Sequence, residues 1–161
     1  MELTPDPVDG TPLTAEEYEA VRAAVAAGGR GGAGTLNSLF AGWRDVVEDM
    51  EDVEEGYGPC APQFDDDLSC RDALGRAWPL LPPRVRAIRR PELDELDGRF
   101  RAATVPWPDR PEEGPRWWHR RIPLVLEAEA GLPRPGGWPL GWEILPFPKP
   151  DGVRVVEWGR P

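Results

Sequence analysis

The part of this chain with the most potential for chemistry is a run of carboxylates between positions 45 and 67. The run reads DVVEDMEDVEEGYGPCAPQFDDD and contains no Lys, Arg or His. Its carboxylates are Asp45, Glu48, Asp49, Glu51, Asp52, Glu54, Glu55, Asp65, Asp66 and Asp67. Such groups can hold a divalent cation, attract a basic protein, or simply keep one face of a helix in water. The elements that position these side chains decide between the three interpretations.

A helix is predicted over residues 35–55, because apolar residues recur there every three or four positions. The apolar stripe consists of Leu36, Leu39, Phe40, Trp43, Val46, Val47, Met50 and Val53. Six carboxylates fall on the opposite side of the helical wheel, and only Glu54 intrudes on the stripe. The simplest interpretation is therefore a helix with one core face and one solvated face.

The solvated face of this helix carries charge of one sign. Its carboxylates include pairs four positions apart, and each such like-charge pair is unfavourable by about 0.2–0.5 kcal/mol. The negative groups also crowd the C-terminal half, where the helix dipole disfavours them. A positive partner would offset this cost. It could be the arginine-rich segment 84–90 of the same chain, or a separate basic protein.

The leading hypothesis is a non-enzymatic acidic binding protein that engages a basic protein partner and needs no cofactor. An inhibitor, immunity protein or antitoxin is the type of protein that such a surface suggests, since acidic side chains can imitate phosphates. The predicted partner-binding residues are Asp45, Glu48, Asp49, Glu51, Asp52, Glu55, Asp65, Asp66 and Asp67.

The alternative hypothesis is a magnesium enzyme. Glu51 and Glu54 have ExxE spacing, and so do Glu92 and Glu95 in a later predicted helix. This spacing resembles that of helical nucleotide pyrophosphatases, in which paired carboxylates hold magnesium against phosphates. The resemblance covers only these few positions, and it implies a magnesium-dependent hydrolase with these glutamates as metal ligands.

Two further groups of residues could do chemistry. Cys60, Cys70 and the only histidine, His119, could support thiol chemistry, but no flanking motif accompanies them. The segment RWWHRR, Arg116–Arg121, could stack bases or bind phosphates. Adjacent tryptophans are more often core anchors flanked by solvated arginines, and the net charge of −10 favours this structural role.

The composition limits the possible functions. The chain of 161 residues has a net charge of −10, and its first 70 residues alone carry −13. General binding to nucleic acid or to anionic membranes needs a basic surface and is not expected. No basic start followed by an apolar run is present, and no stretch is apolar enough to span a bilayer. We therefore expect a cytoplasmic protein with reduced thiols.

The predicted fold class is mainly α (α+β), a compact bundle of four to six helices with a small C-terminal β-hairpin packed on it. Residues 1–12 are expected to be a flexible lead, and 13–161 a single globular domain. The predicted helices are 14–27, 35–55, 66–78, 83–103 and 115–130, and the predicted hairpin is 141–158. Thr14 and Glu17 form a capping box, and Asp65–Asp67 are placed at the start of helix 66–78. Residues 122–128 fit either a helix or a strand.

Overall fold

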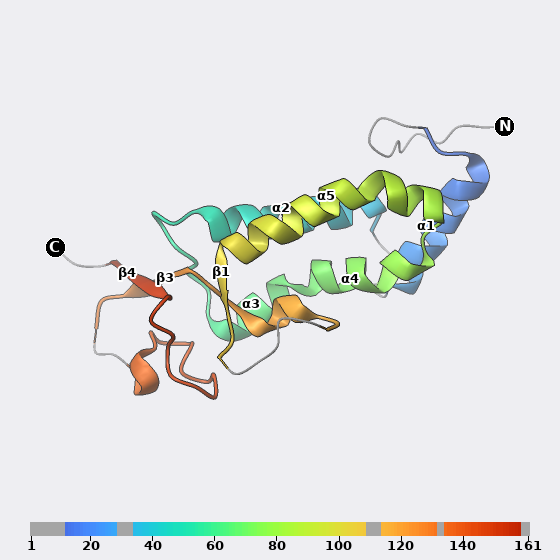
Figure 1. Cartoon of the computed structure of the whole chain (residues 1–161). Coiled ribbons are helices and arrows are strands. Elements are labelled where there is room, and N and C mark those ends of the chain that lie inside the picture. The colour runs from blue at the N-terminus through green and yellow to red at the C-terminus, as the bar shows by residue number, and fades with distance from the viewer. Residues whose placement is uncertain (1–11, 29–33, 109–113, 132–133, 159–161) are drawn as a thin grey trace. The chain divides into compact units, whose positions relative to one another are not determined.

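A computed structural model describes residues 12–28, 34–108, 114–131 and 134–158 (Figure 1). The α-helices are α1 (Ala15–Ala27), α2 (Leu36–Glu51), α3 (Ala61–Asp67), α4 (Ser69–Ala77) and α5 (Pro83–Ala102). The strands are β1 (Thr104–Pro106), β2 (Arg121–Pro123), β3 (Val125–Glu129) and β4 (Arg154–Trp158). Short 3₁₀ turns occupy η1 (Trp78–Leu80), η2 (Trp117–Arg120) and η3 (Pro135–Gly137). The predicted class, mainly helical with a small strand region towards the C-terminus, is confirmed.

The chain divides into two compact units. Unit 1 comprises Met1–Arg44 and Ser69–Asp97, and unit 2 comprises Asp45–Leu68 and Gly98–Pro161. The division falls within α2 and α5, each of which contributes residues to both units. The single-domain interpretation stays a prediction. The expected flexible lead and the Gly-rich segment 28–34 lie almost entirely outside the described residues.

In unit 1, α1 begins and ends where the sequence predicts. Thr14 Oγ1 accepts a hydrogen bond from the Glu17 backbone N–H, and Glu17 Oε1 accepts one from the Thr14 N–H, which completes the capping box. Gly28 is the C-cap, and its carbonyl accepts a hydrogen bond from Arg76 Nε of α4. This contact joins the end of α1 to the helix against which it packs.

Helix α2 confirms the predicted apolar stripe and corrects its C-terminal end. The buried stripe residues are Leu36, Leu39, Phe40, Trp43, Val46, Val47 and Met50. The helix ends at Glu51 rather than near residue 55, and Val53 is 41% exposed. Asp52 Oδ1 accepts a hydrogen bond from the Glu55 N–H in the turn that follows, and Gly56 adopts φ +78°. A local side-chain bond thus replaces helical pairing after Glu51.

The core of unit 1 contains a buried ion pair. The Arg71 guanidinium donates from Nε and NH2 to the two oxygens of Asp97, both at 3.0 Å. Trp43 Nε1 donates to the same carboxylate, also at 3.0 Å. Only 8% of the Arg71 side chain and 12% of the Asp97 side chain are exposed. The pair is therefore bidentate and supported by a third donor, which is how a buried charge is satisfied.

The segment predicted as one helix at 66–78 is two helices. Helix α3 begins at Ala61 with Pro62 in its first turn, Leu68 is its C-cap, and α4 follows at once. Asp65–Asp67 therefore lie in the last turn of α3, and their predicted position at a helix start is wrong. Pro62 fits a first helical turn because its missing N–H has no helical partner there.

Two arginines of segment 84–90, Arg84 and Arg89, have hydrogen-bonded partners within unit 1. Arg84 NH1 lies 2.6 Å from Glu17 Oε1, and Arg89 donates to Asn37 Oδ1 (2.6 Å) and Glu92 Oε1 (3.0 Å). The Arg89 guanidinium also lies over the Phe40 ring, 4.0 Å from its centroid. Helix α5 continues through Pro91, so this proline neither starts nor ends a helix.

Strands replace the helix predicted at 115–130 in unit 2. β2 pairs antiparallel with β1, and β3 pairs in parallel with β4, with Val125 opposite Arg154. The predicted hairpin at 141–158 is wrong in its pairing. Asp151 and Gly152 form a turn, but β4 pairs with β3 rather than with residues 141–145, which also form a turn. The ambiguity at 122–128 is thus resolved in favour of strands.

Tyr57 extends the β3–β4 pair on its other side. Its N–H donates to the Val125 carbonyl (2.9 Å), and its carbonyl accepts from the Glu127 N–H (2.8 Å). Gly56 is required beside it, since a Cβ there would lie 3.1 Å from the Glu127 nitrogen. The loop after the acidic helix is thereby tied to the strands. Among the residues described, no helix combines the length and apolarity needed to cross a membrane.

Candidate partner-binding surface

The carboxylates of α2 lie on its exposed side, as predicted. Asp45, Glu48 and Asp49 are exposed, whereas Val46 and Val47 between them are buried. All of these residues belong to unit 2. The alternation follows from the helical period of the apolar stripe, which turns the intervening residues to solvent.

Asp49 lies at the centre of a group of negative charges. Partial burial raises the pKa of its carboxyl, and the charges of Asp67, Asp45, Glu48 and Asp52 raise it further. We call these five residues the acidic patch. It draws Asp67 of α3 together with the end of α2 and the following loop. Burial is thus the largest cause of the raised pKa of Asp49, and the four neighbouring carboxylates add to it.

Asp67 is fixed in the acidic patch by two donors. Tyr57 Oη donates to Asp67 Oδ2 at 2.5 Å, and Gln63 Nε2 donates to Asp67 Oδ1 at 2.9 Å. Burial and the bond to this carboxylate raise the pKa of the Tyr57 hydroxyl well above its usual range. Tyr57 therefore remains a neutral donor, and it holds one member of the patch in place.

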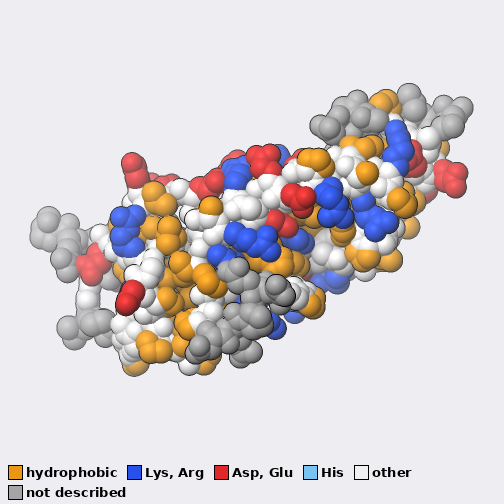
Figure 2. Space-filling view, viewed as in Figure 1, with side chains coloured by type: hydrophobic (Ala, Val, Ile, Leu, Met, Phe, Trp, Pro, Cys, Tyr) orange, Lys and Arg blue, Asp and Glu red, His pale blue; other side chains and the backbone are white. Residues whose placement is uncertain are grey.

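Glu51 is paired within the chain and stands outside the acidic patch. Arg99 of α5 donates to its carboxylate from Nε (3.0 Å) and NH2 (2.6 Å). The hydrogen bond to Arg99 lowers the pKa of Glu51. The sequence suggested the 84–90 arginines as internal partners of the acidic run and missed Arg99. In the view of Figure 2, red and blue side chains lie side by side over α5.

Asp65 belongs to a different arrangement, with His119 and Arg116. His119 Nδ1 lies 2.6 Å from Asp65 Oδ1, and Arg116 NH2 lies 3.0 Å from His119 Nε2. Arginine can only donate, so Nε2 accepts, and Nδ1 carries the proton donated to Asp65. Arg116 adopts φ 60°, a left-handed conformation that is uncommon for a residue other than glycine. Arg116 is exposed, as suggested for the arginines of RWWHRR, whereas Arg121 is buried.

The remaining predicted binding residues, Glu55 and Asp66, are exposed. The structure therefore divides the predicted set by surroundings. Members of the acidic patch are Asp45, Glu48, Asp49, Asp52 and Asp67, while Glu51 pairs with Arg99 and Asp65 with His119.

The magnesium alternative uses glutamates from both units. Glu51 and Glu54 belong to unit 2, and Glu92 and Glu95 to unit 1. Glu92 accepts from Arg89 and lies 3.6 Å from Arg44 NH2. Within the described part of the chain, no group of three or more His, Cys, Asp or Glu residues has a metal-binding arrangement. The magnesium hypothesis stays a prediction, which titration with magnesium and nucleoside triphosphates, followed by thermal unfolding and product release, would test.

The two cysteines are thiols in different surroundings. Cys60 is the exposed N-cap of α3 in unit 2, and Cys70 is buried in α4 of unit 1. Gly42 packs on Cys70, since a Cβ at that glycine would lie 3.3 Å from the cysteine Cβ. Close packing of this kind gives Cys70 the role of a small core residue.

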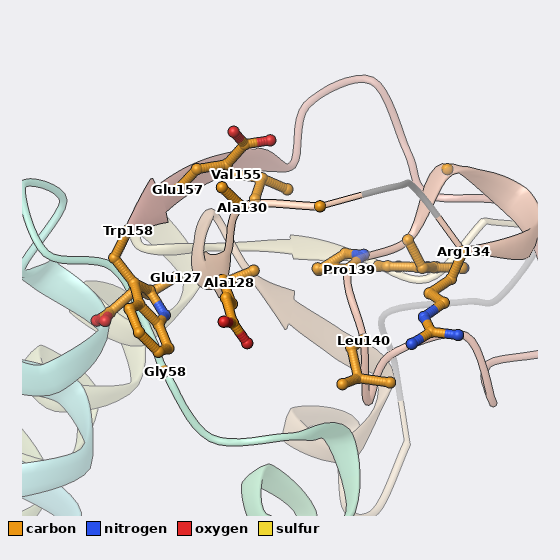
Figure 3. Close-up of a pocket in the computed structure, with 14 residues that line it drawn as sticks. Gly58, Glu127, Ala128, Ala130, Arg134, Pro139, Leu140, Val155, Glu157 and Trp158 are labelled. Atoms are coloured by element: carbon orange, nitrogen blue, oxygen red, sulfur yellow. The ribbon is translucent and has the colours of Figure 1, made fainter. Parts of the chain in front are cut away.

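Two hollows in unit 2 were not predicted. The first, the strand hollow, has a volume of about 550 Å³. In Figure 3, Glu127 and Trp158 lie on one side of it, and Arg134 and Leu140 on the other. Its lining mixes carboxylates, one guanidinium and apolar side chains, and it contains no residue of the acidic patch.

The second hollow, the aromatic hollow, has a volume of about 310 Å³ and lies beside Asp65. Phe64, Trp107, Trp142 and Leu145 form its apolar walls, and His119 lies at its polar edge. These residues are far apart in the sequence, so no local pattern signals the hollow. The eight tryptophans were the only hint of an aromatic site.

Searches with the whole chain against protein-family models, curated proteins and solved structures find no match.

Proposed function

We propose that this chain is a non-enzymatic binding protein whose acidic patch engages a basic protein partner. The observation that carries the proposal is the exposed group of carboxylates on and just after α2, Asp45, Glu48, Asp49 and Asp52. Burial and then the charges of the other patch members raise the pKa of Asp49. Each adjacent like-charge pair on a helix costs about 0.2–0.5 kcal/mol. A partner that places Lys or Arg side chains against the patch relieves this repulsion as it binds.

The proposed partner is a protein with a basic surface, and the proposed class is an inhibitor, immunity protein or antitoxin. The net charge of −10 favours such a partner over nucleic acid, which would be repelled. A cytoplasmic location is part of the proposal. Association should be fast and strongly weakened by salt, because exposed charges steer partners over distances that ions screen.

The test compares two charge variants of equal size. One variant, Asp45→Asn/Glu48→Gln/Asp52→Asn, removes three charges from the acidic patch. The matched control, Glu16→Gln/Glu19→Gln/Asp94→Asn, removes three exposed charges from unit 1. Each chain is used to capture proteins from the host at low and high salt, and each protein identified is purified and its affinity measured.

We expect a basic protein to bind the natural chain and the control alike. The patch variant should bind about tenfold more weakly, since exposed charge pairs contribute about 0.2–1 kcal/mol each. Equal binding by all three chains, or affinity that does not change with salt, would contradict the proposal.

A further inference from the structure

We propose that the aromatic hollow receives one apolar side chain of the basic partner, so that the partner's recognition segment is a Lys- or Arg-rich stretch with a single apolar anchor. This inference rests on the proposed function and specifies the chemistry of the partner. It arises from α3, a single helix that carries a wall of the hollow and a member of the acidic patch.

Helix α3 and its C-cap carry residues of both features. Ala61, Phe64 and Leu68 are buried and line the hollow. Asp67 points to the acidic patch, where its charge acts on Asp49. Asp65 borders the hollow, with 70% of its side chain exposed. A basic residue next to an anchor in the hollow therefore meets the carboxylates of α3.

The walls of the hollow are held in place before any partner binds. Trp142 is 2% exposed, and its Nε1 donates to the Pro59 carbonyl at 3.2 Å. The rings of Phe64 and Trp142 lie 5.8 Å apart between centroids. The Ala61 N–H donates to the Gly141 carbonyl at 3.0 Å, which ties α3 to the segment that carries Trp142. A preformed site loses less conformational entropy on binding.

Glycine at position 141 is what permits this close approach. Gly141 has φ +93°, and a Cβ there would lie 2.7 Å from the Cys60 Cβ. Any side chain at 141 would push the Trp142 segment away from the start of α3. The backbone thus sets the width of the hollow.

The rim of the hollow favours an anchored segment over a free small molecule. Ile144 lines the hollow and is 64% exposed, and Asp65 beside it is also exposed. Small-molecule sites usually enclose most of the ligand, whereas protein interfaces combine an apolar pocket with a polar rim. Figure 2 shows apolar side chains gathered over the C-terminal part of unit 2. This apolar surface beside a row of carboxylates complements an apolar anchor among basic residues.

The test uses two short lysine-rich peptides that differ only at a central leucine or alanine. Three chains are compared by anisotropy of the labelled peptides: the natural chain, Ile144→Ser, and Leu140→Ser. Leu140 is the matched control, because it belongs to the same segment, is 66% exposed, and lines the strand hollow instead. The patch variant with three neutralised carboxylates is included as a fourth chain.

The natural chain should bind the leucine peptide about tenfold more tightly than the alanine peptide, as expected for one buried aliphatic side chain. Ile144→Ser should reduce this ratio of affinities, and Leu140→Ser should leave it unchanged. The patch variant should bind both peptides more weakly, by the same factor.

The outcomes separate the two proposals. The natural chain could bind both peptides equally well while the patch variant binds both more weakly. That result would overturn the proposal of an apolar anchor in the hollow and leave the acidic patch supported. If the patch variant binds both peptides as tightly as the natural chain does, the proposed function is contradicted. Full displacement of the leucine peptide by free indole, with no dependence on lysine content, would identify the hollow as a small-molecule site and overturn the inference.

Discussion

At the scale of single residues, partial burial and then the charges of the other four members of the acidic patch raise the pKa of Asp49 on α2. A raised pKa in an acid means that its ionised form is less favourable in the folded chain than in the unfolded chain. The folded state therefore binds more protons than the unfolded state between the two pKa values. Stability falls as the pH rises through that interval, and the penalty is complete above the raised pKa of Asp49.

We predict that Asp49→Asn raises the free energy of unfolding at neutral pH by about 0.5 kcal/mol, the scale of one or two like-charge pairs. The gain should disappear at acid pH, where the carboxyl is protonated in both states, and shrink at high salt. Urea unfolding at several pH values measures it. Loss of stability at neutral pH would show that Asp49 has a compensating contact.

Asp97 is the opposite case, because its negative charge is compensated by a buried guanidinium and by hydrogen-bond donors. It accepts two bonds from Arg71 and one from Trp43 in the core of unit 1. Asp97→Asn should lower the free energy of unfolding by about 3–5 kcal/mol, because it leaves the Arg71 charge buried without a counter-charge. The control Asp94→Asn, on the exposed side of the same helix, should change stability by no more than about 0.5 kcal/mol. Similar effects of the two variants in chemical denaturation would argue against the buried pair.

At the scale of elements, the capping box of α1 gives the clearest test. Thr14→Ala should cost about 1 kcal/mol, since it removes the acceptor for the Glu17 N–H. Thr14→Ser keeps the hydroxyl and should retain most of the stability. Thermal unfolding of the two variants distinguishes loss of the cap from loss of the side chain's bulk.

The sequence predicted the helices with regular spacing and clear ends. Thr14, Glu17 and Gly28 marked α1 correctly, because caps are local interactions between residues a few positions apart. The end of α2 was wrong because Asp52 bonds to the Glu55 N–H and ends the helix early. Asp65–Asp67 are typical of helix starts by charge, yet Pro62 set the start of α3 upstream.

The strands were not predictable from local pattern. β3 pairs in parallel with β4, which follows it only after a long intervening segment, whereas the Asp151–Gly152 turn favoured a hairpin. Partners in the candidate site are equally remote. His119 and Asp65 are 54 positions apart, and Arg99 and Glu51 are 48 apart. Charge and helical period identified the exposed acidic face, but only tertiary packing decides which carboxylates acquire partners.

At the scale of the whole molecule, α2 and α5 each contribute to both compact units. If one unit unfolded alone, α2 and α5 would each be broken within the helix. The backbone groups at each break would lose their helical hydrogen bonds. We therefore predict a single cooperative unfolding transition, in accord with the single-domain interpretation.

Two variants with similar expected effects, one in each unit, test this cooperativity. Thr14→Ala weakens unit 1, and Tyr57→Phe removes the bond to Asp67 in unit 2 at a cost of about 1–2 kcal/mol. Calorimetry of each variant should show one transition, shifted as a whole to lower temperature. Two separate transitions, of which each variant moves only one, would mean that the units unfold independently.

The contrast between Cys60 and Cys70 has a practical consequence for all of these measurements. The chain has only these two thiols, and one is exposed while the other is buried. A maleimide dye should therefore attach to the unaltered sequence at one position, the start of α3, within a few residues of Asp65 and Phe64. The natural chain thus carries its own attachment point for a fluorescent reporter, close to where we expect a partner to dock.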